Sequence, residues 1–128
     1  MILLDENIPA DQADQLRRWR IRFKQIGLDL GRFGMKDREE ILPLLHRLSR
    51  VTFFTRDLGF YDLAVCHPRY AIACLHVPRS EAAAYIRRVL RHPQLNTTAK
   101  RIGKVMCITP TAITYWAVGT LHQTRLAW

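Results

Sequence analysis

The stretch Val51-Thr52-Phe53-Phe54-Thr55-Arg56-Asp57 decides the fold of this 128-residue chain. Its first five residues are β-branched or aromatic, which is typical of a buried strand. The run then ends in an arginine and an aspartate. A shorter apolar run, Met1-Ile2-Leu3-Leu4, ends in a similar way, in Asp5 and Glu6. The sequence therefore predicts two strands that each carry acid at their carboxyl end.

Strand patterns alternate with helix patterns along the chain, which is typical of a parallel α/β sheet. We expect further strands over 21–26, 71–77, 105–109 and 111–118. We expect helices over 9–20, 37–48 and 80–91, although Pro43 would kink the second. The predicted fold class is α/β: one domain over 1–128, with a central, mostly parallel sheet flanked by helices and a C-terminal β arm.

Size and composition narrow the functional classes. A domain of this length can fold without a metal or disulfide staple, and 48% hydrophobic residues exclude a disordered tail. No apolar run approaches the ~20 residues that span a bilayer, and the early acids argue against a signal peptide. Cys66, Cys74 and Cys107 form no paired motif. We therefore expect reduced thiols in a cytoplasmic protein that does not associate with membranes.

The charge balance is strongly basic. Lys and Arg number 20 against 11 Asp and Glu, so the formal net charge is +9, and only four of these cations are lysines. Because arginine binds phosphate through planar, bidentate contacts, nucleic acid is the expected polyanion. The predicted contacts to its phosphate backbone are Arg56, Arg87, Arg88 and Arg91. The alternative is a charged surface that keeps the protein soluble or meets an acidic protein partner.

The acids indicate a metal site. Because the carboxyl ends of parallel strands share one edge of a sheet, Asp5 and Asp57 should meet although 52 residues separate them. Carboxylates crowded together repel one another without a cation, so we expect the pKa of at least one to be raised. Oxygen ligands without patterned His or Cys favour Mg²⁺ or Mn²⁺. The candidate ligands and catalytic acids are Asp5, Glu6, Asp37, Glu40, Asp57 and Asp62.

Most of these acids also have a purely structural interpretation. Asp5, Asp37, Asp57 and Asp62 each precede a predicted helix or turn and could cap it, with Glu40 completing a capping box. Independent capping would not require two strands to end in acid at the same edge of the sheet. The convergence of the two strand ends is therefore the stronger argument.

Three stretches resemble signature segments of the short PIN-like domains, which are similar to the VapC-type toxin ribonucleases of bacterial toxin–antitoxin pairs. They are, in chain order, Leu3-Leu4-Asp5-Glu6-Asn7-Ile8-Pro9, Lys36-Asp37-Arg38-Glu39-Glu40-Ile41-Leu42 and Thr55-Arg56-Asp57-Leu58-Gly59-Phe60-Tyr61-Asp62-Leu63-Ala64. Many relatives carry a second acid two residues after the Asp57 position, where this chain has Gly59.

The resemblance implies a parallel sheet in the strand order 3-2-1-4-5 and a Mg²⁺- or Mn²⁺-dependent endoribonuclease. It assigns the metal to Asp5, Asp57 and an acid of the 37–40 group, with Asp62 and Glu6 in support. The implied partner protein is a small DNA-binding antitoxin, and a homodimer is a further option for assembly.

Two other functions are compatible with the sequence. A phosphoacceptor receiver domain also gathers acids at the ends of its first and third strands. It needs a lysine at the end of its fifth strand, where this chain has Thr109 and Pro110. A catalytically weak binding module would instead use the basic face to hold nucleic acid or an antitoxin, and its acids would be structural.

Overall fold

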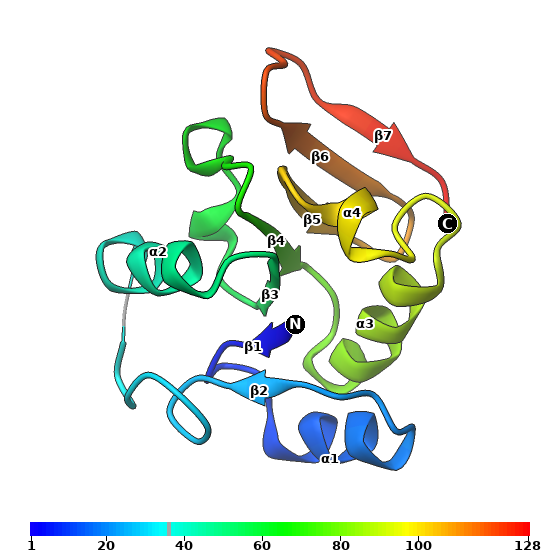
Figure 1. The fold of residues 1–128 in the computed structure, drawn as a ribbon. Coiled ribbons are helices and arrows are strands. Elements are labelled where there is room, and N and C mark those ends of the chain that lie inside the picture. Colours follow the sequence, from blue (N-terminus) through cyan, green and yellow to red (C-terminus); the bar gives the residue numbers. More distant parts are fainter. Residues whose placement is uncertain (36) are drawn as a thin grey trace.

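The fold is built on a seven-stranded sheet, seen in a computed structural model that describes residues 1–35 and 37–128 apart from the side chain of Asp37 (Figure 1). In chain order its strands are β1 (Ile2–Leu4), β2 (Lys24–Gln25), β3 (Val51–Thr55), β4 (Tyr70–Leu75), β5 (Lys104–Ile108), β6 (Ile113–Ala117) and β7 (Thr124–Leu126). The first five strands pair in parallel, β6 pairs antiparallel with β5, and β7 pairs antiparallel with β6. The predicted α/β class with a mostly parallel sheet is confirmed.

The strand order implied by the resemblance is wrong for this chain. The observed order is β2-β1-β3-β4-β5-β6-β7, which places β3 beside β1 rather than at an edge. All five residues of β3 are buried, and a strand buried on both faces belongs in the middle of a sheet. β2 has only two residues, and such a short strand suits an edge.

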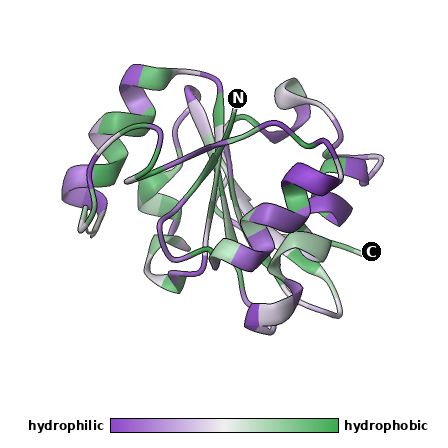
Figure 2. Ribbon diagram, turned by 90° about the horizontal axis from the view of Figure 1, so that it is seen from below, coloured by the Kyte–Doolittle hydropathy of each residue, from purple (hydrophilic) through white to green (hydrophobic). Residues whose placement is uncertain are grey.

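Helices cover both faces of this sheet, which Figure 2 shows with the strands running between them. The α-helices are α1 (Ala10–Arg18), α2 (Asp37–Leu48), α3 (Ala82–Arg91) and α4 (Thr98–Arg101), and the 3₁₀ turns are η1 (Leu58–Phe60), η2 (Leu63–Val65) and η3 (Arg79–Glu81). α1 and α3 pack against one face, whereas α2, η1 and η2 pack against the other. None of the helices in the described part of the chain combines the length and apolar character needed to cross a bilayer.

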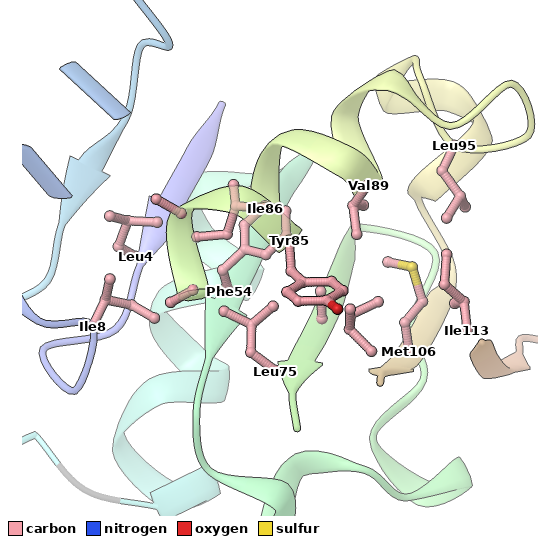
Figure 3. Packing of buried hydrophobic residues seen from close by; sticks show 14 of the residues in the cluster. Leu4, Ile8, Phe54, Leu75, Tyr85, Ile86, Val89, Leu95, Met106 and Ile113 are labelled. Carbon is pink, nitrogen blue, oxygen red and sulfur yellow. The ribbon is translucent and has the colours of Figure 1, made fainter. Parts of the chain in front are cut away.

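Alternation along the strands divides the core into two layers. Leu4 and Phe54 face α1 and α3, and Figure 3 shows this layer. Their neighbours Leu3 and Phe53 face α2 instead. Successive side chains of a strand point to opposite faces, so apolar residues at consecutive positions fill both layers. The continuous apolar runs of β1 and β3 are explained by this arrangement.

Some predicted boundaries need correction. The first helix ends at Arg18, because Arg20 adopts a positive φ of 61° that ends the right-handed helix. The strand expected over 21–26 then shortens to β2. β7 was not predicted. It pairs antiparallel with β6, so the C-terminal β arm consists of β6 and β7 beside the parallel strand β5. Helix α2 continues through Pro43.

A buried arginine connects α4 to the interior strand β3. Arg101 is 5% exposed, and its Nε–H donates to the Thr52 hydroxyl at 2.9 Å while Nη1 donates to the Leu95 carbonyl at 2.8 Å. Burial lowers the pKa of Arg101. A buried charged donor is tolerated only when its hydrogen bonds are made, so this connection depends on the Thr52 oxygen.

Replacing that oxygen should destabilise the fold. Thr52→Val keeps the branched shape but leaves the Arg101 Nε–H without its acceptor. We expect the free energy of unfolding to fall by about 1–3 kcal/mol. Urea unfolding measures this loss, and Thr52→Ser is the control because it loses a methyl group but keeps the acceptor. A valine variant as stable as the parent would contradict this role for Thr52.

Candidate active site

Two neighbouring strands end side by side where the direction of the chain connections changes. From β1 the chain crosses through α1 to β2 on one side, whereas from β3 it crosses through η1 and η2 to β4 on the other. Leu4 pairs with Phe54, and the Asp5 N–H donates to the Phe54 carbonyl at 2.9 Å. Open α/β sheets bind ligands at such a switch point, beyond the carboxyl ends of the strands.

Asp5 lies at this point and is held from three directions. It is 5% exposed. Its Oδ1 accepts the Glu6 backbone N–H at 2.8 Å. Its Oδ2 accepts the Thr55 hydroxyl at 2.7 Å and the Asn7 side-chain amide at 3.3 Å. These bonds fix the carboxylate between the two strand ends.

Asn7 and Thr55 join the segment after β1 to the segment after β3. The Asn7 Nδ2 donates to the Thr55 Oγ1 at 3.2 Å, and the Asn7 Oδ1 accepts the Arg56 backbone N–H at 3.1 Å. The same Thr55 oxygen accepts the Asp57 backbone N–H at 3.0 Å. The position of Asp57 relative to Asp5 is therefore set by neutral hydrogen bonds.

Asp5 and Asp57 line one cavity of about 230 Å³, as the sequence predicts. Its lining is Asp5, Glu6, Asn7, Met35, Ile41, Asp57 and Phe60. A second hollow of about 350 Å³ is lined by Arg38, Glu39, Asp57, Gly59 and Phe60. Because Asp57 and Phe60 belong to both, the two spaces adjoin at the exposed Asp57 carboxylate.

The prediction that one carboxylate resists ionisation is confirmed for Asp5. Burial is the largest cause that raises the pKa of Asp5, and the charges of Glu6 and Asp57 raise it further. Hydrogen bonds from Thr55 and from the Glu6 backbone act in the opposite direction without reversing the shift. Desolvation, rather than repulsion between the acids, is therefore the main cause.

Asp57 has a structural task as well as its place in the cavity. Its Oδ1 accepts the Gly59 N–H at 2.8 Å and caps η1, as the turn interpretation predicts. Its Oδ2 has no hydrogen-bond partner among the described residues. A Cβ at position 59 would lie 2.9 Å from Oδ1, so the second acid that the resemblance leads us to expect there would require the Asp57 carboxylate to shift.

Glu6 lines the cavity but is drawn toward a neighbouring loop. Both of its carboxylate oxygens lie within hydrogen-bonding distance of the Gly34 N–H, at 3.2 and 3.0 Å. The structure thus brings Glu6 close to Asp5 and Asp57, with its charge partly occupied by a backbone donor.

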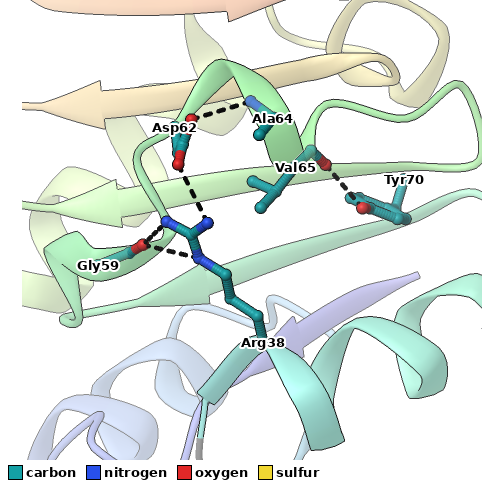
Figure 4. Close-up of polar contacts among 6 residues, drawn as sticks. All are labelled: Arg38, Gly59, Asp62, Ala64, Val65 and Tyr70. Atoms are coloured by element: carbon teal, nitrogen blue, oxygen red, sulfur yellow. Dashed lines mark hydrogen bonds and ion pairs between the residues drawn. The ribbon is translucent and has the colours of Figure 1, made fainter.

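Two other predicted acids lie outside both hollows. Asp62 caps η2 through the Ala64 N–H at 2.9 Å and pairs with Arg38 at 3.0 Å, as Figure 4 shows. The Ala64 hydrogen bond and then Arg38 lower the pKa of Asp62. Glu40 pairs with Arg32 at 2.8 Å. In this structure both acids neutralise nearby arginines.

The 37–40 group also contains Asp37 and Glu39. The side chain of Asp37 lies outside the described residues. Glu39, which the sequence argument does not single out, lines the hollow that adjoins Asp57. The resemblance implies an acid from this group, and among its described side chains Glu39 is the one that lies near the cavity.

The predicted RNA-binding arginines do not form one group. Arg56 directly follows β3, and its backbone is bound by Asn7. Arg87, Arg88 and Arg91 line a separate hollow on α3 that shares no residue with the acidic cavity. The acids and the α3 arginines are therefore two different places on the protein.

The donor set of the cavity fits a hard divalent cation. Magnesium in proteins is commonly held by one or two carboxylates and keeps several waters, and Asp5 and Asp57 supply two such carboxylates. Within the described residues, no group of three or more His, Cys, Asp or Glu side chains is arranged to hold a metal. A bound Mg²⁺ or Mn²⁺ would thus depend on water for most of its ligands.

Sequence reasoning missed the residues that position the acids. Asn7 and Thr55 stand inside the quoted motifs but received no role, because their partners become visible only when β1 and β3 pair. Gln25 was missed entirely. It is buried, and its Nε2 donates to the Asp5 and Ile8 carbonyls at 3.1 and 3.2 Å.

No protein-family model, curated protein or solved structure matches this chain.

The raised pKa of Asp5 predicts how stability responds to pH. The folded protein holds this proton more tightly than the unfolded chain, so ionising Asp5 reduces stability as pH rises from 3.8 through the raised pKa. The free energy of unfolding of the metal-free parent, measured relative to that of Asp5→Asn, should therefore fall as the pH rises through this interval. At pH 7 this difference should remain below its value at pH 3.5.

Urea unfolding of both proteins between pH 3.5 and 7.5, in EDTA, measures this difference. Asp14→Asn is the matched control, because Asp14 is an exposed carboxylate on α1 that pairs with Arg17. If the parent instead gained stability over Asp5→Asn with rising pH, the assignment of a raised pKa to Asp5 would be wrong.

Proposed function

We propose that this protein is a metal-dependent endoribonuclease, acting as the toxin of a toxin–antitoxin pair. The observation that supports it best is the meeting of Asp5 and Asp57 in one cavity at the switch point of the sheet. The motif resemblance and the net charge of +9 point the same way, since an RNA substrate is a polyanion.

In this proposal the acids in and beside the cavity, and the residues that position them, have distinct tasks. Asp5 and Asp57 would hold Mg²⁺ or Mn²⁺, and Glu39 or Glu6 would bind its waters. Asn7 and Thr55 act as positioning residues through their bonds to Asp5. When bound, such a cation stabilises charge on a phosphodiester and lowers the pKa of a water molecule.

Arg38 lines this site, and its N–H groups that do not bind Gly59 or Asp62 would be available to a phosphate. It lines the hollow next to Asp57, and its Nε and Nη2 donate to the Gly59 carbonyl at 3.2 and 2.6 Å. The bonds to Gly59 and Asp62 fix its guanidinium before a substrate arrives. An arginine fixed in advance loses less entropy on binding phosphate.

The phosphoacceptor alternative lacks its lysine. Lys104 begins β5 and so lies at the amino edge of the parallel strands, whereas Asp5 and Asp57 follow the carboxyl ends of theirs. The weak binding module is a better competitor, since Asp57 and Asp62 do cap turns. The absence or presence of cleavage separates it from the nuclease.

Cleavage of RNA should depend on metal and on both aspartates. With a 5′-labelled single-stranded RNA and Mn²⁺, we expect cleavage that EDTA stops. Asp5→Asn and Asp57→Asn should each reduce the rate by about 10²-fold or more, because each removes a ligand charge. Asn7→Ala should reduce it by about 10–100-fold, as loss of a positioning residue does.

Asp14→Asn controls for the loss of a carboxylate elsewhere and should cleave at the parent rate. Parent protein without Mn²⁺-dependent cleavage of any tested RNA would refute the nuclease. Equal cleavage by the parent and both aspartate variants would identify a contaminating nuclease.

Metal binding should also appear in thermal melting. Asp57→Asn keeps an oxygen for the Gly59 N–H and removes a charge that raises the pKa of Asp5, so the metal-free variant should melt at or above the parent Tm. Added Mn²⁺ should raise the Tm of the parent but not of the variant, because a ligand of the folded state stabilises it.

The capping interpretation predicts a different response to metal in the same experiment. If Asp57 served only as a cap, asparagine would cap η1 about as well and Mn²⁺ would shift the Tm of neither protein, whereas Asp57→Ala would cost about 0.5–2 kcal/mol. Differential scanning calorimetry with EDTA and with Mn²⁺ compares the two.

The toxin part of the proposal is tested in cells. Expression of the parent protein should stop growth, and Asp5→Asn should not. Co-expression of a small DNA-binding protein encoded beside this chain should restore growth. Growth arrest that Asp5→Asn retains would argue against an RNA-cleaving toxin.

A further inference from the structure

A continuous basic surface lies on the face of the sheet that α1 and α3 cover. Two open hollows form it. One of about 480 Å³ is lined by Arg17, Arg20, Ile21, Arg22, Phe23 and Lys24. The other, of about 310 Å³, is lined by Arg87, Arg88, Arg91, His92, Pro93 and Trp128. We call the seven Arg and Lys residues of these two linings the basic surface.

A stacked pair joins the two hollows. The Arg87 guanidinium lies 3.6 Å from the centre of the Trp19 ring, which connects α3 to the end of α1. Figure 1 shows these two helices next to each other on one side of the sheet. The hollows are therefore neighbouring parts of one surface.

Aromatic rings orient several of these cations. Arg88 stacks on Trp128 at 4.2 Å, and Arg17 stacks on Phe23 at 4.9 Å. A stacked guanidinium keeps its N–H groups at the edge of its plane, where they remain free to bind an acceptor. Stacking thus prepares these arginines for bidentate contacts with an anion.

The charge of the basic surface is almost uncompensated. Among the described residues, its one ion pair is Arg17 with Asp14, at 2.8 Å. Six of its seven cations therefore have no carboxylate partner there. Like charges at this density repel one another, and a polyanion relieves that repulsion.

The surface suits nucleic acid better than protein. Protein interfaces have an apolar centre, whereas nucleic-acid interfaces are polar and strongly positive. The large apolar side chains that are exposed among the described residues all lie elsewhere: Met1, Leu28, Phe33, Leu58, Val118 and Leu121. Six of the seven cations are arginines, which bind phosphate bidentately.

This surface lies away from the acidic cavity. α1 and α3 start beyond the carboxyl ends of β1 and β4 and run back toward the amino edge of the sheet. The basic surface belongs to the second halves of α1 and α3 and to the segments that follow them, on the side away from the strand ends that carry Asp5 and Asp57.

We propose that the basic surface binds the phosphodiester backbone of single-stranded nucleic acid, at a site separate from the acidic cavity. Binding there does not require cleavage. Its role in holding RNA away from the cut rests on the proposed nuclease function.

Salt-dependent binding tests the surface directly. Anisotropy of a labelled 20-nucleotide oligouridylate in EDTA is measured from 50 to 300 mM KCl. Changing Arg87, Arg88 and Arg91 together to Gln should reduce the slope of log affinity against log salt by about 2, because single strands contribute ~0.7 per phosphate contact. Affinity near 0.1 M salt should fall at least about tenfold.

Two further variants separate place from charge. A triple change of Arg20, Arg22 and Lys24 to Gln should reduce the slope by a similar amount. The control changes Arg47, Arg79 and Arg125 to Gln, which lowers the net charge equally at exposed positions outside the surface. Equal loss of slope in the control would overturn the proposal, since net charge alone would then explain binding.

Arg91→Gln alone checks that lost binding does not come from misfolding. Arg91 makes no hydrogen bond or ion pair in the described part of the chain, so this variant should keep its fold while the slope falls by about 0.7.

The class of partner is checked in the same series. An acidic peptide that binds more tightly than RNA and is lost in the α3 triple variant would overturn nucleic-acid binding. Oligothymidylate distinguishes a DNA backbone from an RNA backbone.

Cleavage gives a distinct readout of the two proposals. The α3 triple variant should cleave a trinucleotide at the parent rate but a 20-nucleotide RNA more slowly. If neither protein cleaves but the slope still changes, the binding surface stands and the nuclease fails. If cleavage depends on Asp5 and the slope does not change, the nuclease stands and the surface fails.

Discussion

Pairing of β1 with β3 is the constraint on which the rest of the structure depends. It aligns Leu4 with Phe54 and so brings two strand ends, 50 residues apart in sequence, into contact. Both are interior strands of the sheet, so their consecutive apolar residues supply the two core layers at once. The carboxylates that follow them have no freedom to separate without breaking this pairing. Stability and the geometry of the acidic cavity therefore have one origin.

The cavity keeps its negative charge because neutral groups hold it together. Asp5 accepts hydrogen bonds from a threonine hydroxyl, an asparagine amide and a backbone N–H, none of which carries charge. In the described part of this protein of net charge +9, no ion pair involves Asp5 or Asp57. Asp62 and Glu40, in contrast, are matched with arginines. The two aspartates of the cavity therefore keep their charge free of any cationic side chain in the described part of the chain.

The sequence allowed the class of fold and the meeting of Asp5 with Asp57 to be predicted, because both depend on local apolar runs and on a general property of parallel sheets. Strand order was not predictable in the same way. It depends on which strand has neighbours on both sides, and the five buried residues of β3 reveal this only in retrospect. The fates of Glu40 and Asp62 depend on long side chains of Arg32 and Arg38, whose direction no spacing rule gives. Asn7 and Thr55 escaped notice because hydrogen bonding across strands leaves no periodic mark in a sequence.

Gly59 lies against the Asp57 carboxylate, on which both the cap of η1 and the acidic cavity depend. Gly59 is not required there by a left-handed backbone, since its φ is not positive. A Cβ at position 59 would lie 2.9 Å from the Asp57 Oδ1, so a side chain there would shift the end of that carboxylate slightly. An acid gained at position 59 would therefore stand directly beside the group that caps η1 and lines the cavity. Adding an acid to this edge of the sheet would thus change the geometry of one that is already there.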